Sequence, residues 1–117
     1  MKGLELSQTI AKILSEKKAS ELKVLKIDDL TIVTDYIVIA SGTSFTQVRS
    51  LADEVEFKLK EELELTPSHM EGYDSRHWIL LDYDTVIVHI FHPEARNYYN
   101  LDKLWADGEE IELNLED

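Results

Sequence analysis

The clearest pattern in the chain is a pair of hydrophobic runs near residue 85. Residues 78–82 and residues 85–91 are separated only by Tyr83 and Asp84. The second run is rich in the β-branched residues Val and Ile, which are typical of strands. We therefore predict a β-hairpin. Its turn lacks the glycine that follows Asp or Asn in the most favourable two-residue turns.

Both faces of this hairpin carry hydrophobic side chains. Because side chains alternate along a strand, Trp78, Leu80 and Asp82 share one face of the first strand. Ile79 and Leu81 occupy the other face. Such a hairpin is either covered by helices on both sides or leaves one hydrophobic face for a partner. Physical grounds alone favour the covered arrangement.

The hydrophobic pattern in the first third of the chain predicts one helix and two strands. A hydrophobic stripe with helical spacing predicts a helix over residues 4–18. Residues 21–27 read as a strand near a sheet edge, because two lysines interrupt the alternation. Residues 36–40 form an unbroken hydrophobic run, which is typical of a central strand that is buried on both faces.

The remaining elements are predicted from caps and from proline. Ser44 and Gln47 match a capping box, so a second helix should begin there, and Pro67 should end it. A short strand over 68–71 and one or two short helices over 94–105 complete the set, the latter with inward-facing Tyr98, Leu101, Leu104 and Trp105. The prediction is an α/β fold, a single small domain with a mixed sheet of about five strands flanked by helices.

Composition narrows the class of protein. The 117 residues are enough for one domain with a hydrophobic core. No hydrophobic run approaches the roughly 20 residues of a membrane helix, so we expect no membrane association. The chain has no cysteine, which excludes disulfides and thiolate catalysis and fits a reducing, cytoplasmic location.

The charge is strongly negative, at −12. Six acidic residues and no basic ones lie in 107–117, which we expect to be a frayed acidic tail. Broad nucleic-acid binding needs clustered Lys and Arg and is therefore not expected. A basic protein partner suits this charge better.

Two carboxylates offer one catalytic hypothesis. Asp82 and Asp84, together with the turn from Ser41 to Ser44, are similar in type to the metal-binding and phosphate-binding parts of a nucleotidyltransferase. Aspartates are also common turn residues, and no phosphate-binding glycine motif is present. His89 and His92 point to opposite faces of a strand, so no metal site is expected. We favour a non-enzymatic protein without a cofactor.

Several segments together resemble the iojap-related family, the bacterial and organellar ribosomal silencing factors. They are TDYIVIASGTS at 34–44, EG at 71–72, WILLD at 78–82, VIVHIF at 86–91, RNYY at 96–99 and LW at 104–105. The resemblance assigns residues 1–106 to one iojap-like domain and does not include the tail. The family often has a glycine in the turn that Tyr83 and Asp84 occupy here.

The resemblance implies a fold related to nucleotidyltransferases without their catalytic apparatus. It also implies binding to the large ribosomal subunit, at its basic protein numbered fourteen. Such binding would block joining of the small subunit and repress translation when nutrients are scarce. We expect the partner-binding face to comprise Trp78, Leu80 and Asp82, with Glu71 and His77 beside them. A homodimer that buries the same hairpin face is a further alternative.

Overall fold

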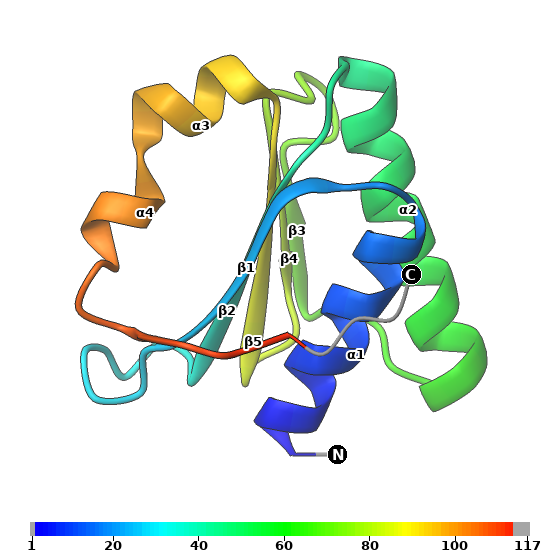
Figure 1. The fold of residues 1–117 in the computed structure, drawn as a ribbon. Helices are drawn as coiled ribbons and strands as arrows, with labels where there is room; N and C mark the ends of the chain where they lie inside the picture. The colour runs from blue at the N-terminus through cyan, green and yellow to red at the C-terminus, as the bar shows by residue number, and fades with distance from the viewer. Residues whose placement is uncertain (1, 114–117) are drawn as a thin grey trace.

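The computed structural model describes residues 2–113 as an open β-sheet with helices on both faces (Figure 1). Along the chain the elements are α1 (Gly3–Glu16), β1 (Ser20–Lys26), β2 (Tyr36–Ser41), α2 (Phe45–Leu63), β3 (His69–Glu71), β4 (Trp78–Asp82), β5 (Val86–Phe91), α3 (Pro93–Tyr99), α4 (Leu101–Leu104) and β6 (Glu109–Glu110). The predicted α/β class and the hairpin of β4 and β5 are confirmed. Within residues 2–113, none of the helices has the length and hydrophobicity needed to span a bilayer.

The sheet has the strand order β3-β4-β5-β2-β1-β6. β2 and β5 run parallel at its centre, and the other neighbours pair antiparallel, so the sheet is mixed as predicted. Every residue of β5 is buried, and only the first residue of β2 is not, as expected for central strands. The described part of the chain contains six strands instead of about five, because β6 pairs with the end of β1.

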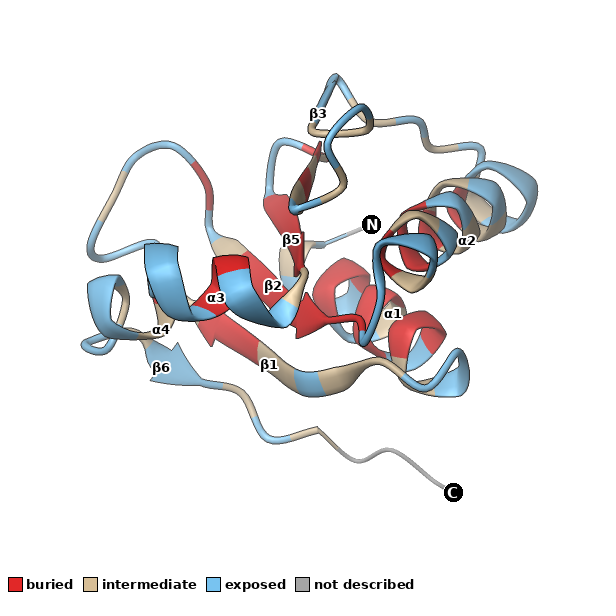
Figure 2. Ribbon diagram, turned by 90° about the horizontal axis from the view of Figure 1, so that it is seen from above, coloured by how far each residue is buried: buried red, intermediate tan, exposed pale blue. Residues whose placement is uncertain are grey.

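Helices of different lengths cover the two faces of the sheet. α1 and α2 lie side by side on one face, and α3 and α4 lie on the other (Figures 1 and 2). The larger core lies beneath α1 and α2 and includes Ile10, Leu14, Leu51 and Leu59. Each such side chain contributes about 1.5–3 kcal/mol when fully buried. A smaller core, which includes Ile39 and Phe91 of the sheet and Leu101 of α4, lies on the opposite face.

The hairpin is covered unequally. Ile79 and Leu81 of β4 are fully buried on the side of α2, whereas Trp78, Leu80 and Asp82 are half-buried on the other side. α3 packs against β5 and is only seven residues long, which is about 10 Å. The prediction that helices cover both faces of the hairpin is therefore right for β5. It is wrong for β4, where one face is only half-buried.

α2 begins where it was predicted and ends earlier. The Ser44 side chain accepts a hydrogen bond from the Gln47 backbone N–H at 3.0 Å, as a helix cap does. The helix ends at Leu63, ahead of Pro67, because Glu64 adopts a left-handed conformation with φ of 55°. This turn lets the Leu65 N–H reach the Leu59 carbonyl and places Leu65 against the larger core.

The short helices α3 and α4 are oriented differently from the prediction. Pro93 is the first residue of α3, as expected. Leu101 is buried and Trp105 is half-buried, but Tyr98 and Leu104 are 81% and 64% exposed. Asn100 has φ of 49° and separates the two helices, so one helical period cannot predict the inward positions of both.

The expectation of a frayed segment after Trp105 is wrong for residues 106–113. Glu109 and Glu110 pair with β1, and the Ile111 N–H donates to the Val24 carbonyl at 2.8 Å. Ile111 and Leu113 pack against the larger core. Hydrophobic residues between the acidic ones therefore hold this segment at the sheet edge. Residues 114–117 lie outside the described part of the chain.

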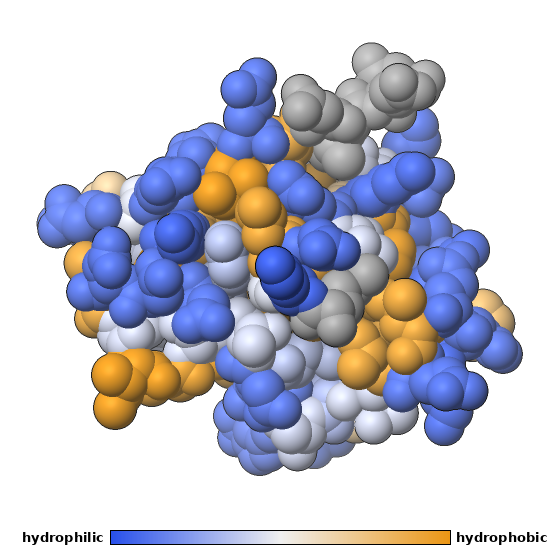
Figure 3. Space-filling view, turned by 90° about the horizontal axis from the view of Figure 1, so that it is seen from below, coloured by the Kyte–Doolittle hydropathy of each residue, from blue (hydrophilic) through white to orange (hydrophobic). Residues whose placement is uncertain are grey.

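The connection between β1 and β2 carries three exposed hydrophobic residues. Leu30, Ile32 and Val33 are 45%, 104% and 69% exposed. This connection lies at the lower end of the molecule in Figure 1. Seen from below, that end shows hydrophobic surface in separate groups between hydrophilic ones (Figure 3). The connection is thus at the opposite end of the sheet from Trp78 and Phe91.

Candidate functional site

Strand register brings four of the five predicted site residues together. Leu80 of β4 is paired with Glu71 of β3, and Trp78 and Asp82 lie on the same face two residues to either side. We call these four residues the β4 strip. His77 lies just before β4, where its ring meets the edge of the Phe45 ring at a centroid distance of 4.9 Å. His77 therefore lies beyond the end of the strip.

Trp78 is both a surface residue and a packing residue. Its ring stacks on Phe91 at 5.1 Å and contacts Tyr99 at 4.7 Å, measured between ring centroids. Its indole Nε1–H donates to Nδ1 of His89 at 3.0 Å. Loss of Trp78 would therefore disturb the smaller core as well as the exposed strip, so Leu80 is a cleaner probe of binding.

His89 is a buried neutral imidazole. It is 8% exposed, and burial lowers its pKa from 6.5 to about 4. Because Nδ1 accepts the hydrogen bond from Trp78, the ring proton must be on Nε2. His89 therefore fixes the position of the Trp78 ring through this hydrogen bond. Its imidazole is buried beneath the surface, where it is not accessible to a metal ion from solvent.

Asp82 and Asp84 hold the hairpin turn. Asp82 Oδ1 accepts from the Asp84 N–H at 2.8 Å, and Asp84 adopts φ of 69°. Ser68 adds a hydrogen bond from its hydroxyl to Asp84 Oδ1 at 3.2 Å. Aspartate tolerates this conformation, which explains why the turn needs no glycine.

The structure separates the two halves of the nucleotidyltransferase hypothesis. Ser41 pairs with Phe91 at one end of β5, whereas Asp82 pairs with Ile87 near the other end. Four residues of strand between these positions correspond to roughly 13 Å. The turn after Ser41 is occupied by the cap of α2. These groups do not form one site, so the hypothesis of a joint Asp82/Asp84 and Ser41–Ser44 site is wrong.

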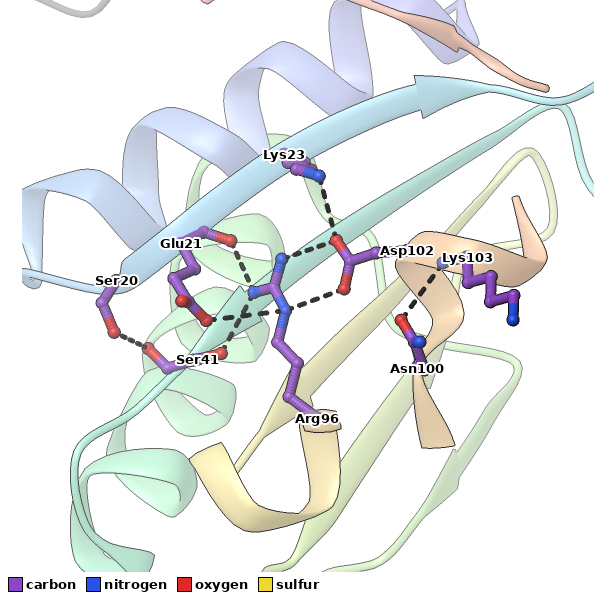
Figure 4. A network of polar contacts seen from close by, with 8 residues as sticks. All are labelled: Ser20, Glu21, Lys23, Ser41, Arg96, Asn100, Asp102 and Lys103. Atoms are coloured by element: carbon purple, nitrogen blue, oxygen red, sulfur yellow. Dashed lines mark hydrogen bonds and ion pairs between the residues drawn. The ribbon is translucent and has the colours of Figure 1, made fainter. Parts of the chain in front are cut away.

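A buried arginine attaches α3 and α4 to the sheet (Figure 4). Arg96 is 6% exposed and donates to both carboxylate oxygens of Asp102, at 3.1 and 2.9 Å. It also donates to the Ser41 hydroxyl at 3.0 Å and to the Glu21 carbonyl. Hydrogen bonds from Arg96 hold the pKa of Asp102 below its usual 3.8. In the sequence Arg96 stood out only as part of the RNYY segment at 96–99, and no pattern predicted this role.

A groove lies between the start of β4 and α3, next to the β4 strip. Ser75, His77, Trp78, Glu94, Ala95, Tyr98 and Tyr99 line this β4–α3 groove. From the sequence we expected Trp78 at the partner-binding face and Tyr98 facing inward, and no role was predicted for Ser75, Glu94 and Ala95. The adjacent tyrosines on a helix that begins at Pro93 were the available signal.

Gly72 allows β3 to lie close to the beginning of β4. It has φ of +92°, and a Cβ there would lie 1.9 Å from the carbonyl oxygen of Trp78. We expect Gly72→Ala to lower the free energy of unfolding by about 2 kcal/mol, from backbone strain and this clash. Urea unfolding measures the change. Ser75→Ala, in the same loop, is the control and should stay within about 0.5 kcal/mol of the parent; equal stability of the two variants contradicts the prediction.

Comparison with known proteins gives a consistent result. Residues 2–117 match the family described as "Ribosomal silencing factor during starvation". Ribosomal silencing factor RsfS of Halalkalibacterium halodurans is 35% identical over 113 residues, which is 97% of this chain and 96% of that protein. The crystal structure of protein CV0518 from Chromobacterium violaceum superposes with a TM-score of 0.86 at 31% identity, covering 99% of this chain and 95% of that one. The mouse protein named "Mitochondrial assembly of ribosomal large subunit protein 1" is 28% identical over 83% of this chain and 43% of its own length.

Proposed function

This chain belongs to the ribosomal silencing factor family, and from that premise we propose that it binds the large ribosomal subunit and blocks its joining with the small subunit. The proposed contact on the ribosome is the basic protein numbered fourteen. By this action the protein represses translation in the cytoplasm when nutrients are limiting. The name of the mouse relative, which refers to large-subunit assembly, supports the choice of subunit.

The β4 strip is the observation that carries this proposal. Leu80 and Trp78 are half-buried hydrophobic residues on a strand that no helix fully covers. Glu71 and Asp82 place carboxylates beside them. A hydrophobic centre with a charged rim is typical of protein interfaces. The protein's overall charge of −12 favours a basic partner.

To block the joining of the two ribosomal subunits, the protein needs only affinity for one of them and sufficient size. It does not need to catalyse a reaction. The described chain measures 33 × 33 × 31 Å along its principal axes. A body of this size bound on the joining face of one subunit would keep the other subunit away. The strip lies on a sheet face and is held in register by β3 and β5, so it is a rigid surface.

Leu80→Lys tests the strip directly. It replaces a hydrophobic contact by a positive charge facing a basic partner, so we expect about a 30-fold loss of affinity, or about 2 kcal/mol. The measurement is co-sedimentation of purified protein with separated ribosomal subunits. Phe57→Lys makes a comparable change on α2, where Phe57 is 58% exposed on the other side of the sheet, and it should bind like the parent.

Several outcomes would count against the proposal. Thermal unfolding must first show that both variants are folded. A parent protein that does not bind large subunits removes the proposed function. Equal binding by the Leu80→Lys and Phe57→Lys variants removes the β4 strip as the site. Binding that leaves subunit joining unchanged removes the blocking mechanism.

A second copy of the chain is the competing occupant of the β4 strip. Burial of the hydrophobic face of β4 in a homodimer would make self-association and ribosome binding exclusive. Sedimentation velocity at several concentrations, with the parent and with Leu80→Lys, separates the two cases. Dimerisation that Leu80→Lys abolishes would place the dimer interface on the strip.

A further inference from the structure

The β4–α3 groove has the chemistry of a site for a positively charged side chain. We propose that it receives an arginine or lysine side chain of the protein partner, held between the rings of Trp78, Tyr98 and Tyr99, with Glu94 as its counter-charge. The inference rests on the proposed function and adds a second, polar anchor next to the hydrophobic β4 strip. Trp78 belongs to both surfaces, so one partner can occupy them together.

Two of the three aromatic rings at the groove are exposed to solvent. Tyr99 contacts Trp78 at 4.7 Å with the ring planes tilted by 46°, and Tyr98 meets Tyr99 edge-on at 5.0 Å. Tyr98 and Tyr99 are 81% and 50% exposed. A cation over such a ring gains about 0.5 kcal/mol when exposed and about 2 kcal/mol or more when desolvated.

Packing within the protein does not account for Tyr98. At 81% exposure its ring contributes little to the smaller core, which Phe91, Ala95 and Leu101 fill instead. A large exposed ring on a helix that is fixed by a buried arginine is more typical of a binding surface. The Arg96 contacts give α3, and therefore Tyr98, a defined position before binding.

The charge of the groove selects a cation. Its lining includes the acidic residue Glu94 and, among the described residues, no lysine or arginine. Glu94 is exposed in the first turn of α3. The net charge of −12 extends this negative field beyond the groove. A nucleotide base could also stack on the rings, but its phosphates would meet the Glu94 carboxylate.

Paired variants test the groove in the binding assay with large ribosomal subunits. We expect Glu94→Gln to weaken binding by about tenfold, because the cation loses its counter-charge. Glu5→Gln is the matched control, since Glu5 is likewise an exposed first-turn glutamate, on α1 across the sheet. Tyr98→Leu should also weaken binding by about tenfold, whereas Tyr98→Phe keeps the ring face and should bind like the parent.

The outcomes separate this inference from the proposed function. A parent that fails to bind large subunits overturns both. If the parent binds large subunits and Glu94→Gln and Tyr98→Leu bind them with the same affinity, only the cation site is overturned. Tighter binding by Glu94→Gln also overturns the cation site. An increase in affinity on removal of the negative charge indicates that the groove holds a stacked nucleotide with its phosphates near residue 94. The cation site is supported if Tyr98→Leu and Glu94→Gln lose affinity for large subunits. In that case Tyr98→Phe and Glu5→Gln must bind them like the parent.

Discussion

Replacing Arg96 by methionine is expected to lower the free energy of unfolding by about 3 kcal/mol, the lower end of the scale for breaking a buried ion pair, because the Asp102 side chain is 25% exposed. Arg96 is 6% exposed, and its guanidinium donates four hydrogen bonds to three residues, which lie on three elements of the fold. Without it, the one ion-pair partner of Asp102 that remains among residues 2–113 is Lys23, at 3.1 Å. The Ser41 hydroxyl also loses its donor.

The comparison with an exposed ion pair makes this test specific. Arg49 pairs with Asp53 one turn away on α2, and both side chains are well exposed, at 42% and 52%. Arg49→Met should therefore cost less than about 1 kcal/mol. Chemical denaturation of both variants measures the difference. If Arg96→Met is as stable as Arg49→Met, the buried cluster contributes little and α3 is held by hydrophobic contacts alone.

The Arg96 cluster also connects stability to binding. It joins α3 and α4 to β1 and β2, so its loss should free the helix that carries Tyr98 and Glu94. The double variant Arg96→Met with Asp102→Leu removes both charges. It should regain part of the lost stability, because the half-buried carboxylate that Arg96 had bonded is removed as well. This recovery distinguishes a charge effect from a loss of side-chain volume.

Lowering the pH from 6.5 to 4 is expected to reduce the free energy of unfolding by about 3 kcal/mol through His89 alone. In the folded protein burial lowers the His89 pKa to about 4, from the 6.5 that it has when exposed. Between these values the unfolded chain binds a proton that the folded chain does not. Stability therefore falls as the pH falls, and above pH 6.5 this group has no effect.

Two asparagine substitutions isolate this effect. His89→Asn cannot titrate but keeps an acceptor for the indole N–H of Trp78. Its stability should change less than that of the parent between pH 6.5 and 4. His77→Asn makes the same substitution at an exposed position and is the control. Urea unfolding at several pH values, followed by tryptophan fluorescence, gives these curves. A parent curve that is flat over this range contradicts the neutral buried imidazole.

Local patterns in the sequence were sufficient for five of the six strands of the described sheet. Alternation placed Trp78, Leu80 and Asp82 on one face, and the structure keeps them there. The capping box located the beginning of α2, and the unbroken hydrophobic run identified β2 as central. These features depend on neighbours within a few residues, because strand and helix periods are properties of the local backbone.

Contacts between distant residues were decided only by the tertiary structure. Arg96 reaches the carbonyl of Glu21, 75 positions earlier in the chain, and no local pattern encodes that distance. No local pattern encodes the pairing of β6 with β1 either. Nor does one encode the location of Ser41 and Asp82 at opposite ends of the sheet. Whether Tyr98 is exposed depends on how a short helix lies on the sheet. The sequence by itself thus determined strands β1 to β5 and the residues on each of their faces. Packing decided which face is open, because burial depends on elements that are remote along the chain.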